Sequence, residues 1–200
     1  LQQVKNQKDY ISKNLGLNLK VLGISNSKKM LVSKEEIDIN NWLEILTNSN
    51  TKADKDLFQK TIIELNRRNS LFIDNTASET IPLTYNNYLK NGVGVITCNK
   101  ISNSGDLSEY KVIRKLSRRH NAAFLYETNV GAALPVISTL KNLINSGDKI
   151  LKIEAVLSGT LNYIFNNFQE EDTFHDIVSH AVKLGYTEPD PKIDLCGIDV

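Results

Sequence analysis

The sequence predicts an α/β protein with an incomplete Rossmann-like parallel sheet, followed by the start of an α+β domain. Four apolar stretches of strand length alternate with segments of helical periodicity, and short polar connections join them. After residue 130 this alternation stops and a different pattern begins. We therefore expect one domain over residues 1–149 and the beginning of a second domain over residues 150–200.

The elements of the first domain follow from local composition. Short apolar runs predict strands, and apolar residues spaced three or four positions apart predict helices. Strands that alternate with helices form a parallel sheet with right-handed crossovers. In chain order we expect a polar helix over 1–13, a strand over 19–24, helices near 41–47 and over 54–67, a strand over 71–73, a helix over 80–90, a strand over 93–97, a helix near 107–116 and a strand over 122–126.

After residue 130, we expect a helix that starts near Pro135, a residue favoured in the first helical turn. Residues 151–157 then alternate between apolar and polar, which predicts a half-buried strand of a second, antiparallel sheet. A helix follows over 161–168. Thr173 and Asp176 resemble a capping box at the start of the next helix, with Asp in place of the usual Glu or Gln.

Polar residues follow all four predicted strands of the first domain, at 25–26, 75–76, 99–100 and 127–129. In parallel sheets, ligands bind beyond the carboxyl ends of the strands. Four polar clusters at equivalent strand ends therefore indicate a binding edge. Lys100 could pair there with a phosphate or polarise a carbonyl, and the alternative is an ordinary solvated lysine.

The sequence contains no G-x-G-x-x-G motif. If the fold binds a dinucleotide, its first strand and glycine-rich turn would precede Leu1. The end of the second strand of such a fold normally carries an acid that binds the ribose of NAD. Residues 25–29 contain no acid and two lysines, which suits a 2′-phosphate, so we expect NADP(H) to be favoured over NAD(H).

The composition argues against several classes of protein. A formal net charge of +1 is unlike that of a dedicated nucleic-acid binder. No apolar run is long enough to span a membrane, and no signal peptide is visible. The two cysteines, Cys98 and Cys196, are far apart, which favours a reducing compartment over a disulfide framework. We expect a cytoplasmic protein, with no nucleic-acid or membrane partner and with a buried thiol at Cys98.

Two irregular segments are candidates for binding. Residues 127–135 join a strand to a helix, so their carbonyl groups need donors, water or a cation. Residues 185–200 place four carboxylates around two prolines, which stiffen the loop. Acids on such a loop can hold a polar substrate, and an ordinary solvated loop is the alternative.

Five segments resemble the homoserine dehydrogenase family, and together the likeness covers essentially the whole chain. It is most similar to the dehydrogenase portion of the bifunctional aspartokinase–homoserine dehydrogenases. This resemblance implies an NAD(P)-dependent oxidoreductase that reversibly reduces L-aspartate 4-semialdehyde to L-homoserine, in threonine and methionine biosynthesis. The segments are DNTAS (74–78), TCNK (97–100), FLYETNVGAALPVI (124–137), EAVLSGTLNYIFN (154–166) and, as the most specific, GYTEPDPKIDLCGIDV (185–200).

The resemblance also implies roles for individual residues. The catalytic candidates are Lys100 and Asp199. The implied cofactor contacts are Thr76, Lys100 and Gly185, and the implied substrate contacts are Glu188, Asp194 and Asp199. A monovalent cation, Na⁺ or K⁺, would be bound largely through carbonyl groups, by Glu127, Val130, Ala132 and Leu134.

The family pattern extends beyond this chain at both ends. Its proton-donating lysine would lie four residues after Asp199, beyond Val200, so we expect this segment to be inactive alone. We also expect a homo-oligomer that forms through the second domain, which in the family carries the catalytic and substrate-binding groups. Two other interpretations stay open: another NAD(P)-dependent dehydrogenase of a small amino acid or aldehyde, and a catalytically inactive interaction or regulatory module that keeps the fold.

Overall fold

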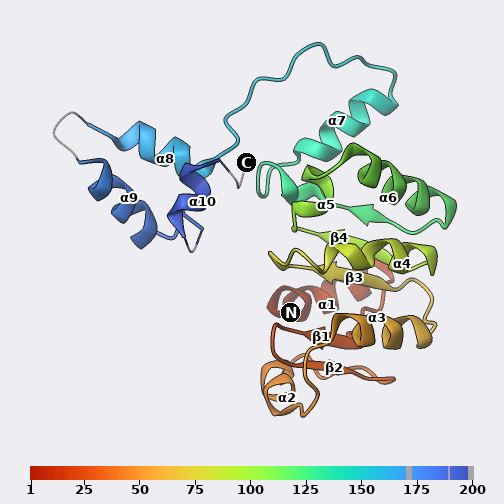
Figure 1. Cartoon of the computed structure of the whole chain (residues 1–200). Coiled ribbons are helices and arrows are strands. Elements are labelled where there is room, and N and C mark those ends of the chain that lie inside the picture. The colour runs from red at the N-terminus through yellow and green to blue at the C-terminus, as the bar shows by residue number, and fades with distance from the viewer. Residues whose placement is uncertain (170–172, 189, 198–200) are drawn as a thin grey trace. The chain divides into compact units, whose positions relative to one another are not determined.

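The computed structural model describes residues 1–169, 173–188 and 190–197 of the chain (Figure 1). Its internal contacts divide the chain into two compact units, Leu1–Asn129 and Val130–Val200. The expected boundary between a cofactor-binding domain and a substrate-binding domain, after residue 149, stays a prediction. Each unit is described by itself.

The first unit alternates helices with short strands, as expected for an α/β fold. Its elements are, in chain order, α1 (Gln2–Leu15), β1 (Gly23–Ser25), β2 (Met30–Val32), α2 (Trp42–Asn48), α3 (Lys55–Glu64), β3 (Leu71–Asp74), the 3-10 turn η1 (Pro82–Thr84), α4 (Tyr85–Lys90), β4 (Gly94–Thr97), α5 (Ile101–Ser104), α6 (Leu107–Arg119), β5 (Phe124–Leu125) and the 3-10 turn η2 (Glu127–Asn129).

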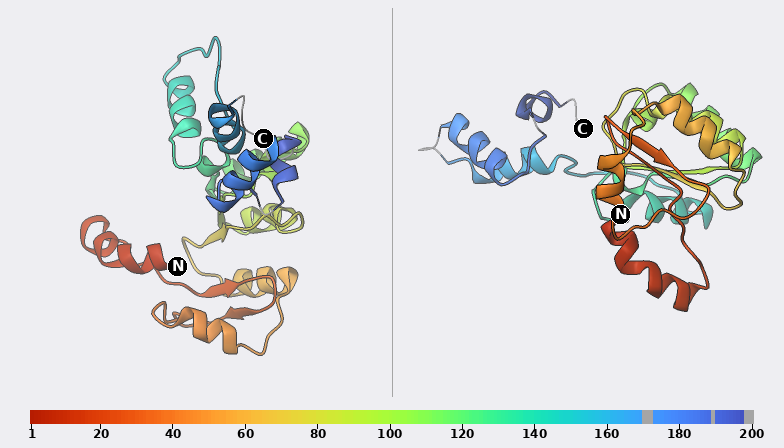
Figure 2. Two further views of the ribbon diagram at one scale, coloured as in Figure 1. Left: turned by 90° about the vertical axis from the view of Figure 1, so that its left-hand side faces the viewer. Right: turned by 90° about the horizontal axis from the view of Figure 1, so that it is seen from below.

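The predicted parallel sheet is confirmed for three strands, in the order β3-β4-β5. On one face, Phe72 packs against the ring of Phe58 from α3 and is stacked on Tyr88 from α4, with ring centroids 4.4 Å apart. Figure 2 shows α3 and α4 on the same side of the strands. Neighbouring residues point to the other face, where Leu71 and Ile73 are each 51% exposed. The described apolar packing against this sheet therefore lies on one of its faces.

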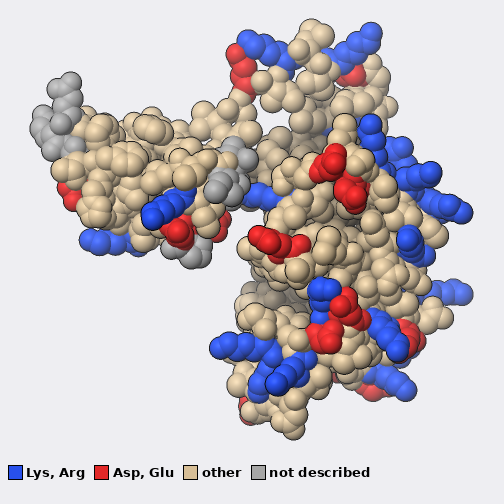
Figure 3. All heavy atoms as spheres, viewed as in Figure 1, with Lys and Arg blue, Asp and Glu red and all other residues tan. Residues whose placement is uncertain are grey.

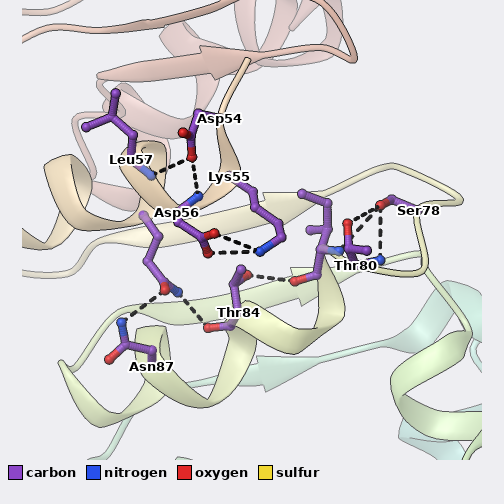
Figure 4. Close-up of polar contacts among 10 residues, drawn as sticks. Asp54, Lys55, Asp56, Leu57, Ser78, Thr80, Thr84 and Asn87 are labelled. Atoms are coloured by element: carbon purple, nitrogen blue, oxygen red, sulfur yellow. Dashed lines mark hydrogen bonds and ion pairs between the residues drawn. The ribbon is translucent and has the colours of Figure 1, made fainter. Parts of the chain in front are cut away.

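A buried amide joins α3 to η1 and α4. Gln59 lies on α3 and is 7% exposed, and its Nε2 donates to the carbonyl of Thr84 at 2.6 Å. Asn87 Nδ2 in turn donates to Gln59 Oε1 at 3.0 Å (Figure 4). Both polar ends of the buried side chain are thus satisfied, as a stable interior requires.

The prediction of a fourth parallel strand over 19–24 is wrong. Strand β1 is shorter and pairs antiparallel with β2, a strand that the sequence did not predict. The cause is local turn chemistry: Asn26 Oδ1 accepts hydrogen bonds from the backbone N–H groups of Lys28 and Lys29, both at 2.8 Å. An Asn side chain that bonds its own backbone in this way reverses the chain, so residues 25–29 form a hairpin turn.

The second unit consists of helices: α7 (Val136–Asn145), α8 (Gly159–Asn167), α9 (Phe174–Lys183) and α10 (Pro191–Leu195). Helix α8 contacts both α9 and α10, and its Ile164 is fully buried. The first half of the predicted capping box at α9 is confirmed, because Thr173 Oγ1 accepts from the N–H of Asp176 at 3.2 Å. The Asp176 carboxylate accepts from the hydroxyl of Thr173 at 2.6 Å, where a capping box has the backbone N–H as donor.

The predicted strand over 151–157 is absent from this unit. These residues have no regular structure, and Leu151 is 93% exposed. A strand needs a neighbour for its N–H and C=O groups, and the described elements of the second unit are all helices. The alternating pattern is present, but the second sheet that it requires is not among the described residues.

The prediction of a buried thiol at Cys98 is also wrong, because its side chain is exposed. Its backbone N–H donates to the carbonyl of Asp74 at 3.1 Å, at the point where the chain leaves β4. The residues on either side, Thr97 and Asn99, are buried, so the Cys98 side chain points away from the interior.

Acidic and basic side chains intermix over the first unit (Figure 3), in keeping with the net charge of +1. Among the described residues, no helix has both the length and the apolar character needed to cross a membrane.

Replacing Asp54 with Ala should lower the free energy of unfolding by about 1 kcal/mol, because Asp54 is the N-cap of α3. Its carboxylate accepts from the N–H groups of Asp56 and Leu57, both at 2.9 Å (Figure 4). Asp106→Ala is the matched control, because Asp106 occupies the N-cap of α6 without a side-chain capping bond. Urea denaturation followed by circular dichroism measures both variants, and equal losses would contradict the capping role of Asp54.

Candidate active site

Two predicted cofactor contacts lie at neighbouring strand ends. Thr76 follows β3 and Lys100 follows β4, and both residues are exposed. Because β3 and β4 are parallel and adjacent, both residues lie at the same edge of the sheet. Open α/β sheets bind their ligands beyond this edge. Contact with a cofactor stays a prediction, and the structure brings the two residues to a suitable place.

A buried carboxylate holds the first of these loops. Asp74 is the last residue of β3 and is 1% exposed. Its Oδ1 accepts from the backbone N–H of Thr76 at 2.8 Å, and its Oδ2 accepts from the hydroxyl of Tyr85 at 2.5 Å. Thr97, the partner of Asp74 in the sheet register, places Oγ1 2.9 Å from the same hydroxyl. The bond from Tyr85 to Asp74, at 2.5 Å, has the short length typical of strong hydrogen bonds to a carboxylate.

Asn99 connects the loop after β3 with the loop after β4. Its Nδ2 donates to the carbonyl of Ser78 at 2.9 Å and lies 3.3 Å from Asp74 Oδ2. Its Oδ1 accepts from the N–H of Ile101 at 3.1 Å, and its own N–H donates to Thr97 Oγ1 at 2.9 Å. Thr76 and Lys100 are therefore carried by two loops that share one hydrogen-bonded network.

The hydroxyl of Tyr85 is the donor to Asp74. Burial raises the pKa of Tyr85, and its hydrogen bond to Asp74 raises it further, so the proton stays on the phenol. Because a phenol has one proton, the hydroxyl of Thr97 is the donor to the Tyr85 oxygen. Sequence reasoning placed Asn99 in a polar cluster at a strand end, but it did not single out Asp74 or Tyr85 as site residues. The sequence did contain a signal for Asp74, because an acid directly follows the apolar run 71–73.

The two lysines of the β1–β2 turn differ in their surroundings. Lys28 is exposed at the turn. The ammonium of Lys29 donates to the carbonyl of Thr47, which holds it against the last turn of α2. Of the two lysines predicted to bind a 2′-phosphate, Lys28 is therefore the one whose side chain is exposed at the turn.

The predicted cation ligands lie on an irregular stretch of backbone. Glu127 is part of η2 in the first unit, whereas Val130, Ala132 and Leu134 belong to the second. Gly131 and Ala132 both have positive φ, at 73° and 51°. A Cβ on Gly131 would lie 2.9 Å from Val136 Cγ2, so this turn requires glycine. Cation binding stays a prediction.

The segment with four carboxylates, residues 185–200, is called the acidic segment. Among its described residues, Asp194 is buried, at 2% exposure. Its Oδ2 accepts from the backbone N–H of Glu188 at 2.8 Å, and its Oδ1 accepts from the hydroxyl of Thr160 at 2.7 Å. Both oxygens are thus engaged in holding the loop. Asp190 caps α10 by accepting from the N–H of Lys192 at 3.0 Å. The structure brings Asp194 and Glu188 together, and Asp199 lies outside the described residues.

Gly185 directs the chain from α9 into this segment. It has a φ of 73°, and the next residue, Tyr186, donates its N–H to the carbonyl of Ala181 at 3.0 Å. Such a left-handed residue after a helix usually is glycine, because it lacks a Cβ. The approach of Gly185 to a cofactor stays a prediction.

A pocket of about 470 Å³ lies between α8 and the start of the acidic segment. Tyr163 and Tyr186 form part of its wall, with ring centroids 4.9 Å apart. The hydroxyl of Thr160, on the same helix, also contacts the carbonyl of Tyr186. Sequence reasoning missed Thr160 and Tyr186, although both fall within segments that resemble the family. Side-chain amides and hydroxyls here suit a small polar ligand. The lining is Gly159, Asn162, Tyr163, Asn166, Asn167 and Tyr186.

Comparison with known proteins agrees with this geometry. The family model "Homoserine dehydrogenase, NAD binding domain" matches residues 1–127, and "Homoserine dehydrogenase" matches residues 135–200. Bifunctional aspartokinase/homoserine dehydrogenase 2, chloroplastic, of Arabidopsis thaliana is 44% identical over 201 residues, which span 100% of this chain and 22% of that protein. Homoserine dehydrogenase of Schizosaccharomyces pombe is 38% identical over 212 residues, spanning 100% of this chain and 55% of that protein.

A solved structure has the same fold. Hyperthermophilic archaeal homoserine dehydrogenase in complex with NADPH has a TM-score of 0.79 at 24% identity, covering 99% of this chain and 60% of that chain. The present chain therefore spans about a fifth of its bifunctional relatives (22%) and about half of the fission-yeast enzyme (55%). The first family model matches residues 1–127, which are more than half of the chain, and the second matches residues 135–200. The chain therefore belongs to the homoserine dehydrogenase family.

Proposed function

We propose that the full-length protein is a homoserine dehydrogenase, which reversibly reduces L-aspartate 4-semialdehyde to L-homoserine with NADPH. The observation that carries this proposal is the hydrogen bonding of buried Asp194. Its carboxylate holds the backbone of Glu188 at 2.8 Å, within residues 135–200, which match the homoserine dehydrogenase family model. The substrate carries an ammonium group, and nearby carboxylates stabilise its charged form.

The residues of this chain have separate tasks in that reaction. Glu188 and Asp199 bind the ammonium of the substrate, and Asp194 positions Glu188. Thr76 and Lys100 hold the nicotinamide cofactor at the edge of the sheet, and Gly185 lets the backbone approach it. NADPH supplies the hydride when bound. The aldehyde oxygen then needs a proton, and a positioned acid contributes roughly 10²–10⁴-fold to such a step.

NADPH is the preferred cofactor in this proposal. The β1–β2 turn contains no acid for the ribose of NAD, and Lys28 is exposed there. The archaeal relative with the same fold was solved in complex with NADPH, which supports the proposal. A monovalent cation, Na⁺ or K⁺, is assigned to carbonyl groups of residues 127–134, which follow a strand without forming a ladder.

Assembly into a homo-oligomer is proposed to use the second unit. Residues 151–157 keep the alternation of a strand, have no regular structure, and expose Leu151 and Ile153, two residues of the same parity, at 93% and 66%. An unpaired strand with one apolar face is a ready surface for pairing with another strand. The cytoplasmic location remains a proposal that rests on the two distant cysteines.

Replacing Glu188 with Gln should raise the KM for aspartate semialdehyde by about tenfold or more, because a hydrogen bond between charged groups is worth roughly 1.5–3 kcal/mol. The KM for NADPH should stay within about twofold. Asp190→Asn is the matched control, since Asp190 is exposed and caps α10. NADPH oxidation by the full-length protein measures both. An inactive wild-type protein, or an unchanged KM in Glu188→Gln, would contradict the proposal.

Replacing Lys28 with Ala should raise the KM for NADPH by roughly threefold to tenfold and leave the KM for NADH unchanged, because an exposed charge pair contributes about 0.2–1 kcal/mol and a phosphate dianion somewhat more. Lys29→Ala serves as the control, because the carbonyl of Thr47 already holds the ammonium of Lys29. A strong preference of the wild-type protein for NADH, or equal effects of Lys28→Ala on both cofactors, would overturn the assignment.

A further inference from the structure

The network around Asp74 contains one member that does not come from a strand end. Tyr85 is the first residue of α4, a helix that covers the sheet, and it is fully buried. Its hydroxyl reaches the carboxylate of Asp74 at 2.5 Å and the hydroxyl of Thr97 at 2.9 Å. A helix of the covering layer is thereby connected to both loops of the binding edge.

Packing alone does not require this hydroxyl. The Tyr85 ring lies 6.4 Å from that of Phe72 and 6.1 Å from that of Phe124, centroid to centroid, and a phenylalanine ring would occupy the same space. A buried hydroxyl is costly unless it is hydrogen-bonded. Its effect on the structure is therefore exerted through the carboxylate that it contacts.

Without the hydroxyl, Asp74 loses its shortest hydrogen bond. Oδ2 would keep Asn99 Nδ2 at 3.3 Å, and Oδ1 would keep the N–H of Thr76 at 2.8 Å. A buried carboxylate that lacks donors is strongly disfavoured, so it turns toward water. This movement weakens its hold on Thr76 and Asn99, which fix the two loops.

We propose that the Tyr85–Asp74 hydrogen bond sets the affinity for the dinucleotide, by holding the loops after β3 and β4 in the arrangement that binds it. Tyr85 is then a positioning residue, because it acts through Asp74 on the two loops. The identity of the ligand rests on the proposed function, whereas the ordering of the loops does not. When only a fraction of molecules has the loops in place, the apparent Kd rises in inverse proportion to that fraction.

The test compares Tyr85→Phe with Tyr88→Phe in the full-length protein. Tyr88 is buried one turn later on α4, and its hydroxyl is not part of the Asp74 network. We expect Tyr85→Phe to raise the Kd for NADPH, measured by nucleotide fluorescence, by about tenfold, the loss typical of one hydrogen bond to a charged group. The KM for aspartate semialdehyde should be unchanged, and Tyr88→Phe should bind NADPH like the wild type.

Amide hydrogen exchange without nucleotide provides the second readout. The N–H groups of Thr76, Asn99 and Ile101 all donate within the network, so their exchange should speed up in Tyr85→Phe and not in Tyr88→Phe. Unchanged exchange, faster exchange with an unchanged Kd, or equal effects of the two variants would overturn the proposal.

Two further outcomes are decided in advance. If Tyr85→Phe fails to fold, Thr97→Val removes the next hydroxyl at nearly constant volume, and should raise the Kd by about threefold. An unchanged Kd there would overturn the proposal. If the wild-type protein binds neither NADPH nor NADH, the proposed function fails, and faster exchange in Tyr85→Phe would still support the ordering of the loops by Tyr85.

Discussion

Each unit of this protein depends on a carboxylate that is buried and must still be supplied with hydrogen bonds. An ionised carboxylate without donors in the interior is strongly disfavoured, so the chain around it has to provide them. Asp74 is 1% exposed and Asp194 is 2% exposed. In both cases one of the donors is a backbone N–H of the loop that follows or precedes it, from Thr76 and from Glu188. The requirement to satisfy the charge therefore determines the shape of the loop.

The two loops have different chemical character. The loop held by Asp74 carries hydroxyl groups and is tied through Asn99 to the loop that presents Lys100. The loop held by Asp194 presents Glu188 beside an aromatic residue, Tyr186. The first arrangement suits a phosphate-bearing cofactor and the second suits an ammonium group. A dehydrogenase of an amino-acid aldehyde has to bind both a phosphate-bearing cofactor and an ammonium group. The chemical groups of the two loops are therefore consistent with the proposed reaction.

Local patterns in the sequence predicted much of the fold, and they failed where a distant partner decided the outcome. Strands over 71–73 and 93–97 were predicted because short apolar runs end in polar residues, and both are present. The strand over 19–24 was placed in the wrong sheet, because the side chain of Asn26 reverses the chain. Residues 151–157 alternate as a strand does, yet a strand also needs a neighbour.

The candidate site was predictable to the same degree. Strand ends and a family motif predicted roles for Thr76, Lys100 and Glu188, and these roles stay predictions. The network that positions them did not, because Asp74 meets Tyr85 and Asn99 across 11 and 25 residues of sequence. The most direct test of the account is a crystal structure of the full-length protein with NADPH and homoserine. We predict cofactor contacts at Thr76 and Lys100, the homoserine ammonium on Glu188, and intact hydrogen bonds at Asp74 and Asp194. A cofactor bound away from the β3–β4 edge, or an ammonium held by other residues, would contradict it.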